Sequence, residues 1–133
     1  MPKSRLVVQG FKDPSLGMYR RDAPTASRLA QAVVLLITAS LGLSLWSGDV
    51  KNGYFNSKDL EREVYIAQPK GGLPGLKPGQ LMRAKKAIYG FSEAARHFWL
   101  AIRDAFIDSG FKQSKLEDAL FYKKENGRIV AVA

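Results

Sequence analysis

The stretch from Leu29 to Leu45 constrains the fold more than any other part of this chain, because it is the most hydrophobic. It is shorter than the roughly 20 apolar residues that a bilayer span needs, and polar residues interrupt it at Gln31, Thr38, Ser40 and Ser44. Ser27 is placed to cap a helix that runs to about Leu41, and Gly42 is placed to end it. We therefore predict a buried helix whose apolar stripe contains Leu29, Val33, Leu36, Ile37 and Leu41, widened by Val34 and Leu35.

A lone carboxylate follows this helix in an unusual setting. Leu43 to Val50 predicts a strand with Asp49 at its end, and Asn52 to Asp59 predicts a turn or a single helical turn. An aspartate at a strand end is more often a turn or cap residue than a metal ligand, because its side chain readily bonds nearby backbone amides. Two aromatic residues follow it. Tyr54 is open to a core or a ligand-contacting role, whereas the pattern favours a core position for Phe55.

The remaining segments alternate between strand and helix patterns. We predict strands at Arg5 to Val8, Glu63 to Pro69 and Leu81 to Ile88, and a loop from Lys70 to Gly79 that is rich in glycine and proline. Ser92 to Ser109 predicts a helix that ends at Gly110, with an apolar face of Ala94, Phe98, Ala101, Ile102, Ala105 and Phe106.

The C-terminal region predicts a hairpin. Leu120 to Lys124 and Gly127 to Val132 are strand-like and flank Glu125-Asn126, which we expect to form the turn. The order strand, helix, strand, strand, helix, hairpin indicates an α+β chain with an antiparallel sheet and packed helices.

Charge is the least ordinary part of the composition. Twenty-one Lys and Arg oppose twelve Asp and Glu, which gives a net charge of +9 over 133 residues. Such an excess favours a polyanionic partner, because neutralised phosphates release condensed counterions. The alternative is a basic surface that serves solubility alone.

Two features that the sequence lacks, cysteine and a signal peptide, narrow the possible classes of protein. The sequence contains no cysteine, which excludes disulfides and thiolate metal sites and fits an intracellular protein. Met1 to Gly10 holds basic residues but no apolar core of signal-peptide length. We therefore expect no membrane partner.

Several segments together resemble the reverse transcriptases of copia-type retrotransposons. Asp49 to Asn56 (DVKNGYFN) is similar to the first catalytic motif of that family. Lys3 to Phe11 (KSRLVVQGF), Glu63 to Pro69 (EVYIAQP) and Ala87 to Phe91 (AIYGF) resemble other family segments in the same order. Phe111 and Leu120-Phe121-Tyr122 fit the stretch before the family's final catalytic strand.

The resemblance implies a set of site residues. Asp49 would be the catalytic aspartate, binding Mg²⁺ (or Mn²⁺) together with the backbone carbonyl of Val50, and Tyr54 would exclude ribonucleotides by blocking the 2′ position. The other nucleotide-binding residues would be Lys3, Arg5, Tyr89 and Gly90. Nucleic-acid contacts would come from Lys51, Arg83, Lys85 and Lys86.

The resemblance also implies a domain plan and partners. Residues 1–133 would be a partial reverse transcriptase domain, with fingers at roughly 1–44 and 57–91, palm at roughly 45–56 and 92–133, and no thumb. The implied activity is RNA-directed DNA polymerisation by two-metal nucleotidyl transfer. The implied partners are an RNA or DNA template-primer, deoxynucleoside triphosphates and the other regions of a transposon polyprotein.

Two departures from the family pattern set limits on that reading. Ser92-Glu93-Ala94-Ala95 stands where the family has Lys-Gln-Ala/Ser-Pro, so a carboxylate replaces a cation beside the nucleic acid unless Glu93 pairs with Arg96. The family's Tyr-x-Asp-Asp hairpin, expected after the strand at Gly127 to Ala133, is not in this sequence. We therefore expect this chain alone to be inactive.

Three interpretations remain. The first is a polymerase domain that works only with its missing carboxylates, and the second is a non-catalytic basic remnant of a transposon that binds nucleic acid by charge. The third is an unrelated basic structural protein. His97, the only histidine, has no second ligand near it in sequence and is expected to be structural.

Overall fold

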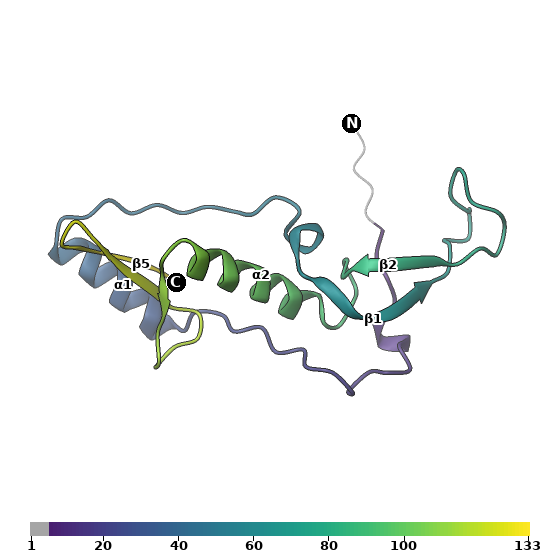
Figure 1. The fold of residues 1–133 in the computed structure, drawn as a ribbon, viewed down its shortest axis with the longest axis horizontal. Helices are drawn as coiled ribbons and strands as arrows, with labels where there is room; N and C mark the ends of the chain where they lie inside the picture. Colours follow the sequence, from purple (N-terminus) through teal and green to yellow (C-terminus); the bar gives the residue numbers. More distant parts are fainter. Residues whose placement is uncertain (1–5) are drawn as a thin grey trace.

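The computed structural model describes residues 6–133 and is elongated (Figure 1). At one end lie helix α1 (Arg28–Ser40) and a hairpin of β4 (Phe121–Glu125) and β5 (Arg128–Val132), and at the other lie β1 (Asp59–Ile66) and β2 (Met82–Lys86). Helix α2 (Ala94–Asp108) runs between the two ends. The shorter elements are η1 (Gly10–Lys12), η2 (Gly53–Asn56) and β3 (Lys112–Gln113).

The shape leaves an unusual amount of surface in contact with solvent. The accessible area is 10376 Å² for 14.7 kDa, whereas a compact monomer of that mass exposes about 6,900 Å². The chain is therefore an open arrangement of elements around a small core.

The described strands form two antiparallel sheets in place of one. β1 pairs with β2, placing Val64 opposite Ala84 and Tyr65 opposite Arg83, and the second sheet has the order β3-β4-β5. These bounds confirm the predicted α+β class, the antiparallel pairing, the 70–79 loop and the strands that correspond to β1 and β2. The short helical turn predicted after Asn52 is η2.

Helix α2 and its boundaries follow the sequence prediction closely. It begins at Ala94 and ends at Asp108, with Ser109 as its C-cap and Gly110 directly after it. Its first turn packs into the main core, which consists of buried Ala87, Phe91 and Ala94 with half-buried apolar side chains around them (Val8, Tyr54, Leu60, Val64, Ile66, Ala84 and Ile88).

Helix α1 has the predicted boundaries but not the predicted burial. Ser27 accepts a hydrogen bond from the Ala30 amide at 3.1 Å, as an N-cap should. However, Leu29 and Leu36 of the predicted stripe are 75% and 66% exposed, and Val33 and Leu41 are exposed as well. Ile37 of the predicted stripe and Val34 beside it are half-buried as expected, but the buried residue is Ala30, which the prediction left out. Both sides of this helix are apolar, and periodicity alone cannot choose between them.

The C-terminal hairpin is confirmed, with its turn one residue later than predicted. Glu125 pairs with Arg128, so the two turn residues are Asn126 and Gly127. Both have positive φ, 51° and 76°, which is the geometry of a two-residue type I′ turn and the reason that Asn-Gly is favoured there.

Two predicted strands are wrong. Leu43 to Val50 is irregular, and so are residues 6–9; Arg5 lies outside the described residues. A strand needs a ladder partner, and the two sheets of the described chain offer none to residues 43–50, which span the distance between α1 and η2 (Figure 1).

Candidate functional site

Asp49 lies on the irregular segment that joins α1 to η2. Its side chain is exposed, and within residues 6–133 it makes no hydrogen bond or ion pair. The expectation that Asp49 stands at the end of a strand is therefore wrong for this structure. Neither of the two sheets pairs with this segment.

Tyr54 sits on η2 in an aromatic cluster. Its ring meets Tyr89 edge-on with centroids 4.8 Å apart, and Phe98 with centroids 6.0 Å apart. Phe55, predicted to be the core residue of this pair, is 54% exposed. The 3₁₀ turn at Gly53–Asn56 turns one ring inward and the next outward, so the structure joins the predicted nucleotide-binding residues Tyr54 and Tyr89.

Gly90 is in close contact with the chain's own backbone. Val8 donates to the Tyr89 carbonyl at 2.8 Å, and Gly10 donates to the Gly90 carbonyl at 3.1 Å. Gly90 has φ +94°, and a Cβ there would lie 1.9 Å from the Val8 carbonyl oxygen. Glycine is thus required at this position by the docking of the N-terminal segment, a cause that the sequence analysis did not consider.

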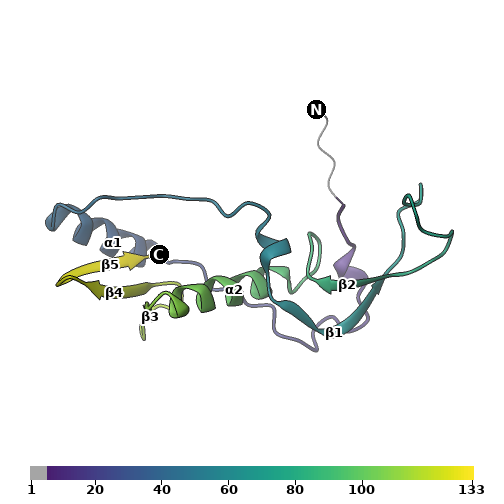
Figure 2. The ribbon, with the colours of Figure 1, turned by 45° about the horizontal axis from the view of Figure 1, so that its top comes forward.

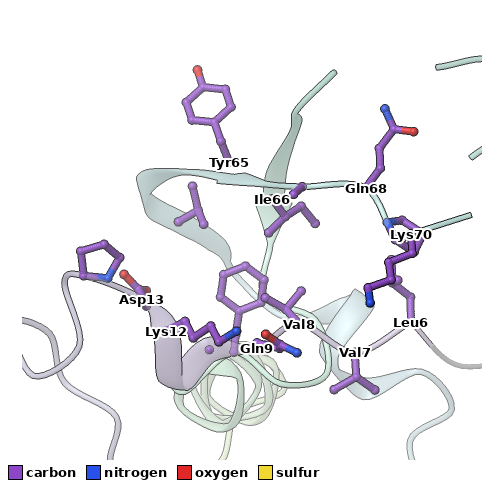
Figure 3. A pocket seen from close by; sticks show the side chains of 16 residues that line it. Leu6, Val7, Val8, Gln9, Lys12, Asp13, Tyr65, Ile66, Gln68 and Lys70 are labelled. Atoms are coloured by element: carbon purple, nitrogen blue, oxygen red, sulfur yellow. The ribbon is translucent and has the colours of Figure 1, made fainter. Parts of the chain in front are cut away.

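A groove of about 570 Å³ lies between residues 6–14 and the end of β1. Figure 3 shows Val8 and Ile66 facing each other across it, Lys12 and Lys70 at its sides, and Tyr65 pointing away. Neither Asp49 nor Tyr54 lines it. The structure therefore does not gather the predicted catalytic residue and this groove into one site.

A partly buried ion cluster fixes the N-terminal segment to β1 and to the start of α2. The Arg62 guanidinium bonds Glu93 at 2.8 Å and also bonds Asp13, while its flat face lies 4.4 Å from the Tyr19 ring centroid. The Tyr19 hydroxyl lies 3.0 Å from the Asp13 carboxylate and 2.7 Å from the Ser92 hydroxyl. We name Asp13, Tyr19, Arg62, Ser92 and Glu93 the Arg62 cluster.

The cluster corrects the prediction for Glu93. Its partner is Arg62 on β1 and not Arg96, which instead pairs with Asp22 at 2.9 Å. Glu93 is 3% exposed. Its charge is therefore neutralised inside the protein and does not face a nucleic acid as an unpaired carboxylate.

The pKa values in the cluster move in the directions that this arrangement requires. Burial pushes the pKa of Asp13 upward, but hydrogen bonds from Arg62, the Ser15 amide and Tyr19 outweigh it, so the net pKa is lowered. Burial raises the pKa of Tyr19, and the nearby Asp13 carboxylate adds to that rise. Burial lowers the pKa of Arg62, yet bonds to Glu93 and Asp13 raise it overall.

The predicted nucleic-acid contacts divide into paired and unpaired cations. Arg83 bonds Glu63 at 2.9 Å, and Lys86 lies 4.0 Å from Asp59. Within the described residues, Lys51 and Lys85 are exposed and make no ion pair. Lys3 and Arg5 lie outside those residues.

Comparison with known proteins decides the family. Residues 1–133 match the protein family described as Reverse transcriptase (RNA-dependent DNA polymerase). The chain belongs to this family.

Three curated relatives each contain a region that is similar to this reverse transcriptase chain. It is 28% identical over 129 residues to the Retrovirus-related Pol polyprotein from transposon RE2 of Arabidopsis thaliana, and 26% identical over 129 residues to the one from transposon RE1. It is 30% identical over 132 residues to the Retrovirus-related Pol polyprotein from transposon TNT 1-94 of Nicotiana tabacum. Each match covers 96% of this chain but only 9% or 10% of the relative. No solved structure matches.

The reverse transcriptase chain does not assemble a metal site from its described residues. Those residues contain no group of three or more His, Cys, Asp or Glu side chains that could hold an ion. Magnesium takes hard oxygen ligands, so Asp49 fits as one ligand and does not by itself make a site. His97 is buried, its Nδ1 has no hydrogen-bond partner within residues 6–133, and its backbone carbonyl accepts a bond from the Lys58 amide. Its structural role stays a prediction.

Sequence reasoning missed the Arg62 cluster almost entirely. Asp13, Arg62 and Glu93 are far apart in the chain, and only Glu93 drew attention, as a departure from the family pattern.

No helix within residues 6–133 has the length and hydropathy to span a membrane.

Proposed function

We propose that this chain is part of the RNA-directed DNA polymerase of a copia-type retrotransposon polyprotein, and that it catalyses no synthesis by itself. The observation that carries the proposal is the match of residues 1–133 to the reverse transcriptase family, joined to the ordered motifs around Asp49, Glu63 to Pro69 and Tyr89-Gly90. The relatives are named as transposon Pol polyproteins, which supports the polyprotein context.

Asp49, with the Val50 carbonyl, is proposed to supply one set of oxygen ligands to Mg²⁺ or Mn²⁺. Two divalent ions stabilise the attacking and leaving oxygens in phosphoryl transfer of this kind. The described residues contain no group of three or more side chains that could hold an ion, and the remaining ligands are proposed to come from the rest of the polymerase. The exposed position of Asp49 leaves it accessible to them.

Tyr54 is proposed to set sugar specificity, by closing on the 2′ position of the incoming nucleotide. Its packing against Tyr89 and Phe98 supports this role, because a steric filter works only if the ring cannot swing aside. Tyr89 and Gly90 lie next to it in the fold, and Lys3 and Arg5 are proposed to bind the triphosphate. The template-primer is proposed to meet Lys51, Arg83, Lys85 and Lys86.

The fingers and palm boundaries follow as part of the same proposal. Residues 1–44 and 57–91 are assigned to fingers, and residues 45–56 and 92–133 to palm. The core supports a close link between the two, since it joins Val8, Val64 and Ala87 from the first set to Tyr54 and Ala94 from the second.

Primer extension tests the proposal. The chain alone should extend no primer on an RNA template, whereas a longer polyprotein segment that contains residues 1–133 and the region after them should do so in Mg²⁺. In the longer protein, Asp49→Asn should abolish extension and Asp108→Asn, on the exposed end of α2, should not. Extension that survives Asp49→Asn would refute the catalytic role.

A second function, binding of nucleic acid by charge alone, is favoured by the net charge of +9. Affinity for single-stranded RNA should then fall steeply with salt and show no sequence preference, because released counterions drive it. Lys51→Met and Lys85→Met should each reduce the salt dependence by about one counterion. A filter-binding titration that is flat between low and physiological salt would exclude this function.

A further inference from the structure

The turn that carries Tyr54 is packed against helix α2. In Figures 1 and 2, the teal turn η2 lies beside the first half of α2, directly before β1. Phe98, on that part of the helix, meets the Tyr54 ring at an interplanar angle of 90° with centroids 6.0 Å apart. Gly53, the preceding residue of the turn, lies against the same phenyl ring. One side chain of α2 therefore contacts two successive residues of η2.

Gly53 shows how closely this ring is packed. A Cβ at Gly53 would lie 2.7 Å from both Cε2 and Cζ of Phe98 and 3.2 Å from its Cδ2. Carbon atoms in contact are about 3.5–4.0 Å apart, so any side chain at position 53 would displace either the turn or the phenyl ring. The position of the ring therefore depends on the absence of a side chain at Gly53.

The other end of the turn is attached to α2 through polar contacts. Ser57, the C-cap of η2, is buried, and its hydroxyl donates to the Tyr54 carbonyl at 2.6 Å. The Lys58 amide donates to the His97 carbonyl at 3.3 Å, and the Lys58 ammonium lies 2.8 Å from the Asp104 carboxylate of the same helix. Both ends of η2 are therefore fixed to α2.

A ring that excludes a hydroxyl group must keep its position when the hydroxyl presses on it. Its rotamer has to be locked by neighbouring side chains, to within about 0.5 Å of the working geometry. Without the phenyl group of Phe98, the space beside Tyr54 would be empty and the ring could move into it. A methyl group at Gly53 would disturb the same arrangement from the other side of the contact.

We propose that Phe98 is a positioning residue for sugar selection, which acts through Tyr54 and Gly53 by holding η2 and its ring in place. The proposal rests on the role proposed above for Tyr54, as the residue that excludes ribonucleotides. It gives Phe98 no contact with the nucleotide. A smaller side chain at position 98 therefore lowers the selectivity for deoxynucleotides even though Tyr54 is still present.

Nucleotide selection by the longer polymerase segment tests the proposal. The measured quantity is kcat/KM for a deoxynucleotide divided by kcat/KM for the matching ribonucleotide, on one RNA template-primer in Mg²⁺. Tyr54→Ala should lower this ratio about a hundred-fold, because it removes the filter itself. Phe98→Ala should lower it about ten-fold, because the ring remains but is no longer held in place. Phe98→Leu should fall between Phe98→Ala and the wild type.

Double variants separate positioning from a general loss of structure. In the Tyr54→Ala background, Phe98→Ala should change the ratio by less than about two-fold, because residues that act through one another are not additive. Gly53→Ala should also lower the ratio. Phe98→Leu should restore part of it in that background, because leucine lacks the Cε2 and Cζ atoms that the new Cβ meets. A residue that only stabilised the fold would not produce this rescue.

Phe106→Ala is the matched control, because Phe106 is a half-buried phenylalanine of the same helix whose ring packs on Phe111 and Phe121. It should destabilise the fold by leaving a cavity but keep the ratio within about two-fold of the wild type. If Tyr54→Ala leaves the ratio unchanged, the sugar filter itself is refuted, and the role of Phe98 with it. If Tyr54→Ala lowers the ratio but Phe98→Ala does not, or if Phe106→Ala lowers it equally, only the role of Phe98 is refuted.

Discussion

Replacing Arg62 by Met removes the cation that is bonded to both the buried carboxylate of Glu93 and the partly buried carboxylate of Asp13. The Arg62 side chain is 26% exposed, and those of Asp13 and Glu93 are 12% and 4% exposed. Without the guanidinium, Glu93 keeps no charged partner within residues 6–133, and Asp13 retains from those residues only its bonds from the Ser15 amide and Tyr19. The variant also loses the packing of Arg62 on the Tyr19 ring.

The expected cost follows from this burial. Breaking a buried ion pair by removing one partner costs about 3–5 kcal/mol, because an unpaired charge remains in the protein. The two bonds that Asp13 keeps place the expectation at the lower end, about 3 kcal/mol at pH 7. With a urea dependence of about 2 kcal/mol per molar, the midpoint should fall by about 1.5 M.

Urea unfolding followed by circular dichroism, at one low protein concentration, measures this cost. Arg83→Met is the control, because Arg83 also bonds a glutamate from a strand but both side chains are about 60% exposed; it should cost less than about 1 kcal/mol. Arg62→Lys should fall between the two, since it keeps the charge but loses the planar fork. Equal midpoints for Arg62→Met and Arg83→Met would refute the reasoning.

Three further predictions concern the backbone, the helix cap and pH. Gly90→Ala should destabilise the fold by about 2 kcal/mol or more, because the new Cβ would lie 1.9 Å from the Val8 carbonyl oxygen. Gly79→Ala is the control, since Gly79 also has positive φ but lies in open space, and it should cost about 1 kcal/mol. Equal urea midpoints for the two variants would contradict this prediction. Ser27→Ala should lower the free energy of unfolding by about 1 kcal/mol, because it removes the side chain that caps the Ala30 amide, and helical ellipticity should fall with it. An unchanged ellipticity would show that this cap does not stabilise α1. The pKa of Asp13 is lowered in the folded chain, so the stability that its ionised form contributes is complete above the unfolded pKa of 3.8 and is lost as pH falls through the folded pKa. Asp13→Asn should therefore reduce the loss of stability at acid pH in a curve of unfolding free energy against pH. An unchanged acid part of that curve would count against the cluster.

Local signals explain why part of this fold was predictable. The cap at Ser27, the glycine after α2 and the hairpin turn each act within a few residues, so the boundaries of both helices and the existence of the hairpin could be predicted from the sequence, although the turn itself was placed one residue too early. The basic strand β2 and the glycine-rich loop before it are local in the same sense.

The failures all depend on partners far away in the chain. Whether Leu43 to Val50 forms a strand depends on a neighbouring strand, and none of the described strands pairs with it. The α1 stripe was predicted only in part: Val34 and Ile37 are half-buried, but Leu29 is exposed and Ala30 is buried, because both sides of the helix are apolar and only packing decides between them. The Arg62 to Glu93 pair spans 31 positions and leaves no periodic signal.

The candidate site, like the fold, was predictable where local motifs decide it and not where distant partners do. The motifs identified the family from sequence, and the structure brings Tyr54 and Tyr89 into contact. The predicted position of Asp49 at a strand end is not found, because a strand depends on a distant partner and neither sheet pairs with residues 43–50. The assignment of Asp49 therefore rests on its chemistry and motif, and it is open to a direct chemical test.

That test is a change of metal preference in the longer polymerase segment. The 133 residues contain no cysteine, so Asp49→Cys places a soft thiolate where a hard carboxylate stood, and thiolates favour soft ions over Mg²⁺. If Asp49 binds the metal, primer extension by Asp49→Cys should be lost in Mg²⁺ and partly restored by Cd²⁺, with no such gain for Asp108→Cys. Full activity of Asp49→Cys in Mg²⁺ would contradict the account.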